Sequence, residues 1–109
     1  MKLQTVIVAT LLSVAISSPA LAAKGDAGAG KTKSTACAAC HGPDGNSLAP
    51  DFPKLAGQQG DYISHTLHAY KTKKRSNAIM NGQAATLTDQ DIADLSAYYA
   101  SQKGLSIKR

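Results

Sequence analysis

The sequence has 109 residues, a formal net charge of +5 and two cysteines. This length suits a single small domain, and two cysteines exclude a framework of several disulfide bonds. Tryptophan is missing, and Phe52 and four tyrosines are the only large aromatics, so side chains alone would give a thin apolar core. The sequence contains no internal repeat, low-complexity tract or nucleic-acid-binding motif, and we predict no nucleic-acid partner.

Residues 1–22 have the pattern of a secretory signal peptide. Lys2 gives a short positive start, Val6–Ile16 is largely apolar, and the segment ends in the small-x-small pattern of a cleavage site. An uncleaved anchor is the alternative, but the apolar run is shorter than the ~20 residues of a spanning helix. We therefore predict cleavage after Ala22, export to the periplasm, and a mature domain of residues 23–109 without stable membrane insertion.

Residues 24–40 are expected to form the first helix, although three glycines weaken it. Each glycine costs a helix about 1 kcal/mol relative to alanine. We interpret Gly25 as part of a frayed start, and Gly30 as a position that lets a second helix cross closely.

The stretch Cys37-Ala38-Ala39-Cys40-His41 is the attachment signature of c-type haem. Two thiols at this spacing can add to the two vinyl groups of one porphyrin, and His41 follows as the proximal ligand of the iron. The alternatives are a thioredoxin-like redox pair, which expects a βαβ context, a zinc site, which needs four ligands, and a plain disulfide. Export supports one covalently bound haem c, because bacteria attach haem outside the cytoplasm.

Residues 42–60 are rich in turn-forming residues, and we expect a long loop that the edge of a haem would order. Asp61–Tyr70 then has the apolar spacing of a helix, with Ile63 and Leu67 on its buried face. His65 and His68 fall on the opposite face, where solvated histidines are expected rather than metal ligands.

Four basic residues follow this helix, namely Lys71, Lys73, Lys74 and Arg75. Most such runs are solvated loops. An electrostatic docking patch for acidic partners is the alternative, with Arg75 as a possible partner of a haem propionate. The pattern favours neither interpretation.

Met80 is the single methionine of residues 23–109 and lies in a polar stretch before Gly82, where we expect a loop. A methionine of the core would follow a helical periodicity, which is not seen here. We therefore predict Met80 as the second iron ligand, with His65 and His68 as rivals. Ligation by histidine and methionine raises the reduction potential and leaves no open position for a substrate.

The last helix is expected to begin after Thr88, which is a good N-cap, with acidic residues in its first turn. Lys103 and Gly104 are predicted to close it. Its buried stripe is predicted to consist of Ile92, Leu95, Ser96 and Tyr99, with Tyr98 at the flank.

Residues 24–103 resemble the class I c-type cytochromes, in particular the short bacterial monohaem proteins related to cytochrome c553 and to one half of cytochrome c4. Four segments carry the resemblance: residues 37–42, 53–57, 75–80 and 87–99. The resemblance implies an all-α cytochrome c fold, in which three main helices and long loops surround one covalently bound haem.

The resemblance also implies several roles for single residues. The carbonyl of Pro53 would orient the imidazole of His41, and Leu55 would pack on the haem. The first and last helices would cross at Gly30 and either Tyr98 or Tyr99. Lys33 departs from the family, which has an aromatic residue near this position.

These features predict a periplasmic electron carrier that exchanges single electrons with redox partners and is not an enzyme, since no nucleophile–base pair or paired carboxylates are evident. One alternative is a haem-based gas sensor or peroxidase-like protein with a labile ligand in place of Met80. Another is a thiol oxidoreductase that uses Cys37 and Cys40 without haem.

Overall fold

Five helices and the loops between them form the part of the chain that the structure describes, residues 9–10, 13–15 and 23–105. The structure is a computed structural model, and no strand occurs among these residues. The predicted all-α class is therefore confirmed. Most of the predicted signal peptide, including Ala22, lies outside the described residues. Of the helices that are described, none is long and apolar enough to cross a membrane.

The predicted helix over residues 24–40 is wrong in one respect, because two shorter helices take its place. These are α1, Ala27–Lys33, and α2, Thr35–His41. The break lies at Ser34, whose N–H donates to the carbonyls of both Gly30 (2.9 Å) and Lys31 (3.3 Å). The Ser34 hydroxyl also donates to the Lys31 carbonyl at 2.7 Å. The two bonds from Ser34 to Lys31, three positions earlier, tighten the turn and end the first helix.

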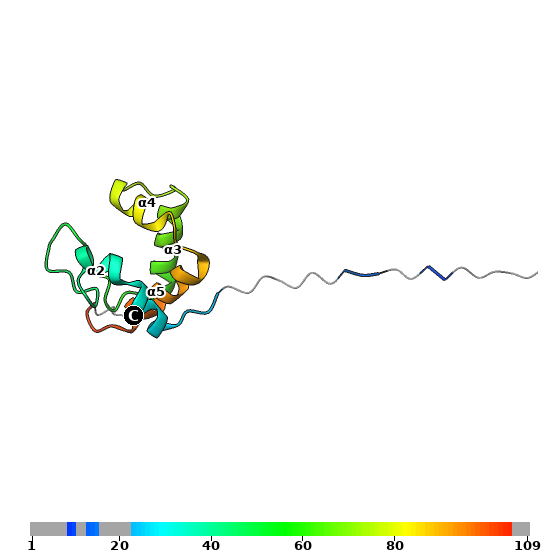
Figure 1. Cartoon of the computed structure of the whole chain (residues 1–109), viewed down its shortest axis with the longest axis horizontal. Helices are drawn as coiled ribbons and strands as arrows, with labels where there is room; N and C mark the ends of the chain where they lie inside the picture. The colour runs from blue at the N-terminus through cyan, green and yellow to red at the C-terminus, as the bar shows by residue number, and fades with distance from the viewer. Residues whose placement is uncertain (1–8, 11–12, 16–22, 106–109) are drawn as a thin grey trace, which may run out of the picture.

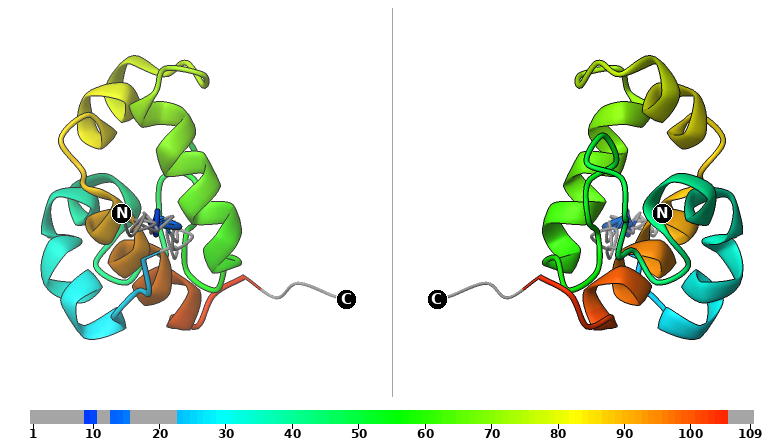
Figure 2. Two further views of the ribbon diagram at one scale, coloured as in Figure 1. Left: turned by 90° about the vertical axis from the view of Figure 1, so that its right-hand side faces the viewer. Right: turned by 90° about the vertical axis from the view of Figure 1, so that its left-hand side faces the viewer.

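Helix α1 packs across α5, Asp89–Ser101 (Figure 2). A Cβ added at Gly30 would lie 2.0 Å from the Asp94 carbonyl oxygen and 2.7 Å from the Tyr98 Cβ. The predicted crossing at Gly30 is therefore present, with Tyr98 as its aromatic partner. Gly25 lies outside α1, which begins only at Ala27, but it is also a close-packing position, because a Cβ there would lie 2.1 Å from the Ala93 carbonyl oxygen.

The side chain of Lys33 stabilises the same crossing through charge. Its ammonium lies 2.9 Å from an oxygen of Asp91 and 2.6 Å from an oxygen of Asp94. Asp94 is only 2% exposed, and its other oxygen accepts hydrogen bonds from the Asp26 N–H and the Gln90 amide, both at 2.8 Å. The hydrogen bond from Lys33, together with the others, lowers the pKa of Asp94 to about 2.

Helix α3, Gly60–Lys71, agrees with the predicted helix to within one residue at each end and packs against α5. Ile63 is buried in the core together with Leu95, Tyr98 and Tyr99, and Leu67 packs against this cluster. His65 is exposed, and the side chain of His68 is 43% exposed. Both histidines thus lie on the surface, as expected.

The start of α5 confirms the prediction at Thr88. The Thr88 hydroxyl accepts the N–H of Asp91, and the Asp91 carboxylate accepts the N–H of Thr88, which is a complete capping box. The predicted stripe is buried, and Tyr98 is buried with it. The helix ends at Ser101 with Gln102 as its cap, before the predicted Lys103 and Gly104.

Helix α4, Ala78–Ala84, corrects the prediction of a loop around Met80. Asn77 is its N-cap, and the Asn77 side-chain oxygen accepts the N–H of Met80 at 3.0 Å. Figure 1 places α4 beside one end of α3, away from α2. A seven-residue helix of about two turns has too few residues to show an apolar periodicity, which is why the sequence pattern did not indicate a helix.

Replacing Gly30 by alanine tests how closely α1 and α5 approach. We expect Gly30→Ala to lower the free energy of unfolding by about 1–3 kcal/mol, because the added methyl group would overlap the backbone of α5. Gly82→Ala is the matched control, since a Cβ there would meet nothing within 4 Å. That control should be neutral or stabilising by up to about 1 kcal/mol. Urea denaturation of both variants measures this, and equal effects would contradict the crossing.

Candidate functional site

Helix α2 brings together the three residues of the attachment motif. Cys37 and Cys40 stand three positions apart in this helix, so both thiols face the same side. The two cysteines are not joined in a disulfide. Within the described residues, no group of three or more His, Cys, Asp or Glu side chains is placed to hold a metal ion, as a zinc site would require. The arrangement suits attachment of one flat group to two neighbouring thiols.

His41 ends α2 and is held in one orientation. Its Nδ1 lies 2.8 Å from the carbonyl oxygen of Pro53, which is the contact implied by the resemblance. A carbonyl only accepts hydrogen bonds, so Nδ1 carries the proton and Nε2 keeps a free lone pair for a metal ion. The imidazole is 7% exposed, and the Phe52 ring stands in a T-shaped arrangement with it at a centroid distance of 6.4 Å.

The loop between α2 and α3 carries Pro53 to His41. It begins at Gly42, whose φ of +83° turns the chain out of the helix. The carbonyl of Gly45 then accepts the N–H groups of Leu55 and Ala56 at 2.8 and 3.2 Å, which closes the loop on itself. This closure returns the segment that contains Pro53 to the end of α2.

Helix α5 fixes both ends of this loop. The Tyr98 hydroxyl donates to the carbonyl of Pro43 at 2.9 Å, and the N–H of Gly57 donates to the carbonyl of Tyr99 at 2.9 Å. The ring of Tyr99 lies so close to Gly45 that a Cβ there would be 2.8 Å from it. Protein contacts thus order a loop for which we expected a haem edge to be needed.

The hydroxyl of Tyr99 is buried without a hydrogen-bond partner among the described residues. It lies near the thiol of Cys37, and burial raises the pKa of both groups above their usual ranges. An unpartnered buried hydroxyl costs about 1–3 kcal/mol. Its place beside the first thiol of the motif fits a site that a bound group completes.

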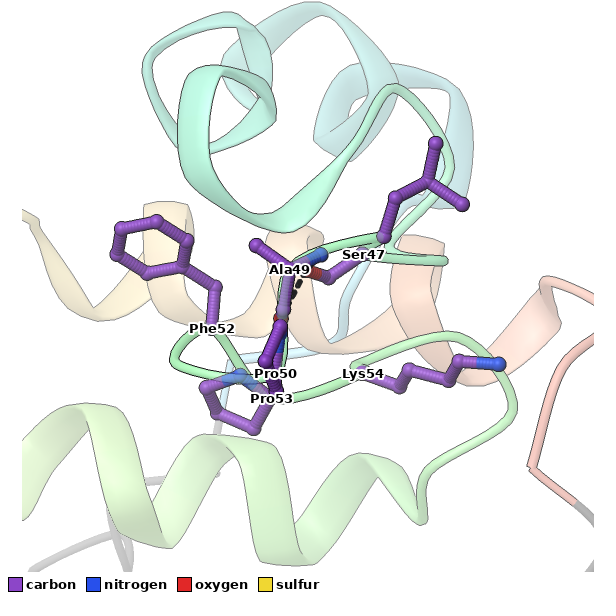
Figure 3. Close-up of a pocket in the computed structure, with 7 residues that line it drawn as sticks. Ser47, Ala49, Pro50, Phe52, Pro53 and Lys54 are labelled. Carbon is purple, nitrogen blue, oxygen red and sulfur yellow. Dashed lines mark hydrogen bonds between the residues drawn. The ribbon is translucent and has the colours of Figure 1, made fainter.

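Two shallow, mainly apolar hollows lie beside the attachment motif. One, of about 320 Å³, lies along the loop and is drawn in Figure 3. The other, of about 360 Å³, extends to Cys40 and shares Leu48, Ala49 and Phe52 with the first. The first hollow is lined by Ser47, Leu48, Ala49, Pro50, Phe52, Pro53 and Lys54. An apolar surface next to Cys40 suits contact with the flat ring of a porphyrin.

The other predicted site residues lie on separate elements. Leu55 is partly buried and packs, like Cys37, against the core cluster. Met80 lies on α4 and is partly buried. The guanidinium of Arg75 stands 5.1 Å from the centroid of the Tyr70 ring, so it is engaged on the surface of α3. The roles of Leu55, Met80 and Arg75 toward a haem stay predictions.

Two side chains with clear structural roles were not indicated by the sequence. Lys33 was noted only as a departure from a family, whereas it forms the ion pairs of the α1–α5 crossing. Asn81 forms three side-chain hydrogen bonds around the turn before Met80. The only local signal was its spacing of four residues from Asn77, another amide that can cap a helix.

The fold and the site together define a class of small all-helical protein with a paired-thiol motif, an oriented histidine and an apolar surface beside them. Residues 25–103 match the family model described as Cytochrome c. The chain belongs to the cytochrome c family, whose members bind haem and transport electrons. Its all-α architecture is the cytochrome c fold that the sequence predicted.

Relatives of known identity agree with this assignment. The chain is 50% identical over 97 residues to cytochrome c4 of Pseudomonas aeruginosa, covering 89% of this chain and 48% of that protein. It is 46% identical over 82 residues to cytochrome c-554(548) of Halomonas halodenitrificans, covering 72% of this chain and 99% of that protein. The chain thus spans about half the length of the cytochrome c4 relatives that it matches.

A solved structure matches the fold as well. The structure of reduced recombinant cytochrome c4 from Pseudomonas stutzeri superposes with a TM-score of 0.71 at 46% sequence identity. The match covers 74% of this chain and 47% of that one. This likeness extends the family assignment from sequence to backbone.

Proposed function

We propose that this protein is a periplasmic cytochrome that carries single electrons between redox partners by means of one haem c, and that it is not an enzyme. The observation that carries the proposal is the hydrogen bond from His41 Nδ1 to the Pro53 carbonyl, at 2.8 Å. It leaves Nε2 ready to bind iron at the end of the helix that bears both thiols. When bound, haem c supplies an iron that alternates between Fe(II) and Fe(III).

Each residue of the site has a distinct part in this proposal. Cys37 and Cys40 hold the haem through two thioether bonds, and His41 is the proximal ligand. Pro53 orients His41 through its carbonyl and keeps the imidazole in one tautomer. Met80 is the second ligand, which fills the remaining position and raises the reduction potential. Leu55, which packs against the core cluster, packs on the haem and excludes water.

The relatives support a carrier with protein partners. One of them, 34% identical over 68 residues, is named the thiosulfate dehydrogenase electron acceptor of Stutzerimonas stutzeri; the match covers 60% of this chain and 32% of that protein. We propose by analogy that this chain receives electrons from one protein and passes them to another. The chemistry at its own site then requires no substrate-binding group beyond the haem.

Export and haem attachment can be tested on one sample. Expression in a bacterium with haem-maturation machinery should give an intact mass equal to residues 23–109 plus one haem, because cleavage is expected after Ala22. The haem should stay with the protein during extraction with acid and organic solvent, since thioether bonds are covalent. A mass that still includes residues 1–22, or haem that passes fully into the solvent, would refute the corresponding part.

Met80→Ala tests the second ligand. The variant should keep its haem, show a lower reduction potential, and bind carbon monoxide when reduced and cyanide when oxidised. Ile79→Ala is the matched control, because Ile79 is the preceding residue of α4 and is 59% exposed. If Met80→Ala behaves like the control, another residue is the ligand and His65 and His68 are tested next. If the unaltered protein already binds carbon monoxide, a gas sensor becomes the better proposal.

The basic run after α3 supports docking of acidic partners, although not all of its members contribute equally. The Lys71 ammonium donates to the carbonyl of Leu87, which ties it to the structure. Lys73 and Lys74 are exposed, next to α4 and its Met80. Arg75 is engaged with the Tyr70 ring. We therefore assign the attraction of acidic partners mainly to Lys73 and Lys74.

A double change of charge tests this assignment. Lys73→Glu/Lys74→Glu should slow electron transfer to an acidic partner by about tenfold or more at low salt. The difference should fade as the Debye length falls from about 30 Å at 0.01 M to about 3 Å at 1 M salt. Lys31→Glu/Lys103→Glu is the control, since both residues are exposed and lie at α1 and after α5. Equal rates for the two double variants would contradict a docking patch at this position.

A further inference from the structure

The side-chain amide of Asn81 joins three consecutive parts of the chain. Its Nδ2 donates to the carbonyls of Tyr70 and Arg75, both at 2.8 Å. Its Oδ1 accepts the N–H of Asn77 at 2.9 Å. The two donor bonds fix which way the amide points, because the reversed amide would set an oxygen against two carbonyl oxygens. All the hydrogen-bonding groups of this amide are thus directed at backbone atoms.

These bonds satisfy backbone groups that the helices leave open. Tyr70 is in the last turn of α3, where its carbonyl has no partner within the helix and also accepts the Lys73 N–H of the following turn at 3.2 Å. Asn77 is the N-cap of α4, and its N–H donates to the Asn81 side chain one turn further along that helix. Arg75 lies in the turn between the two. Asn81 therefore ties the end of α3, the connecting turn and the start of α4 into one unit.

Met80 is held from both sides by this unit. Its own N–H donates to the side chain of Asn77 at 3.0 Å, and the next residue is Asn81. α4 has only seven residues, and a helix of this length is marginal in water without tertiary support. The position of Met80 hence depends on the bonds that attach α4 to α3.

We propose that Asn81 is a positioning residue that holds Met80 at the iron and so limits the entry of external ligands. This inference rests on the proposed ligation by Met80. A methionine is a neutral ligand that competes with small molecules for one coordination position. Because Met80 is already held nearby, it binds with a lower entropy cost than a free ligand does. A loosened α4 would raise that cost, since Met80 would then have more conformations to lose on binding.

The test measures the affinity of the oxidised haem protein for imidazole, which displaces a methionine ligand. Asn81→Leu removes the three side-chain hydrogen bonds while keeping a side chain of similar size. The variant should raise the apparent affinity for imidazole about tenfold, which is equivalent to about 1.4 kcal/mol, because the lost hydrogen bonds no longer hold α4 in place. Gln83→Leu is the matched control, because Gln83 is an exposed residue of the same helix, and it should leave the affinity unchanged.

Two further variants separate positioning from general stability and from simple access. Lys33→Met weakens the α1–α5 crossing, so it should lower the free energy of unfolding without changing the imidazole affinity. In a Met80→Ala background, Asn81→Leu should have no further effect, since no methionine remains to be positioned. The inference is overturned if Asn81→Leu matches Gln83→Leu, or if it raises the affinity equally with and without Met80.

Failure of the inference can be told apart from failure of the proposed function. If Met80→Ala raises the imidazole affinity and Asn81→Leu does not, Met80 is the ligand and only the role of Asn81 is wrong. If Met80→Ala itself leaves the affinity unchanged, the proposed ligation fails and the role of Asn81 fails with it. A rise in both, with non-additive effects, supports the two together.

Discussion

The contact between the backbones of α1 and α5 is the constraint on which the rest of this structure depends. Gly30 allows the two helices to approach so closely that any side chain in its place would overlap the Asp94 carbonyl. This approach sets the place of α2, which follows α1 after a single turn at Ser34. At the same crossing, the Tyr98 hydroxyl donates to the Pro43 carbonyl and the Tyr99 carbonyl accepts the Gly57 N–H, so α5 also fixes the long loop. This one close crossing therefore positions both α2, which carries His41, and the loop that carries Pro53.

The two sides of the proposed site differ in how firmly they are held. On the proximal side, His41 is buried, bonded to Pro53 and supported by a loop that is fixed to α5. On the other side, Met80 lies on a short helix that packs against α3 and is tied to it by the amide of Asn81. A rigid proximal side would keep a haem in one orientation, whereas a short distal helix would leave the strength of the proposed Met80 ligand open to adjustment by single residues.

The parts of the fold with a local pattern could be predicted from the sequence. Helix α3 and the capping box at Thr88 follow from apolar spacing and polar caps, and the attachment motif is complete within five residues. The break at Ser34, the close approach at Gly25 and the helix around Met80 were missed. The break at Ser34 and the helix around Met80 follow from local bonds made at Ser34 and Asn77, which the spacing of apolar residues does not report. The close approach at Gly25 depends on the Ala93 carbonyl, far along the chain. Pro53 was indicated only through the family resemblance, because no local pattern links it to His41.

The buried carboxylate of Asp94 indicates how the crossing is made specific in the absence of the aromatic residue expected near Lys33. A buried ion pair gains little net stability, since desolvation of both charges offsets their attraction. Its geometry is nevertheless exacting here, because Asp94 must meet the Lys33 ammonium and the Asp26 N–H at once. A slip of either helix would leave a buried charge without partners. Because the pKa of Asp94 is lowered, its ionised carboxylate contributes to folding stability at any pH above its ordinary pKa of about 4. This contribution to stability is lost as the pH falls through about 2. The register of α1 against α5, and with it the placement of His41, is therefore secured by charge over the whole neutral range.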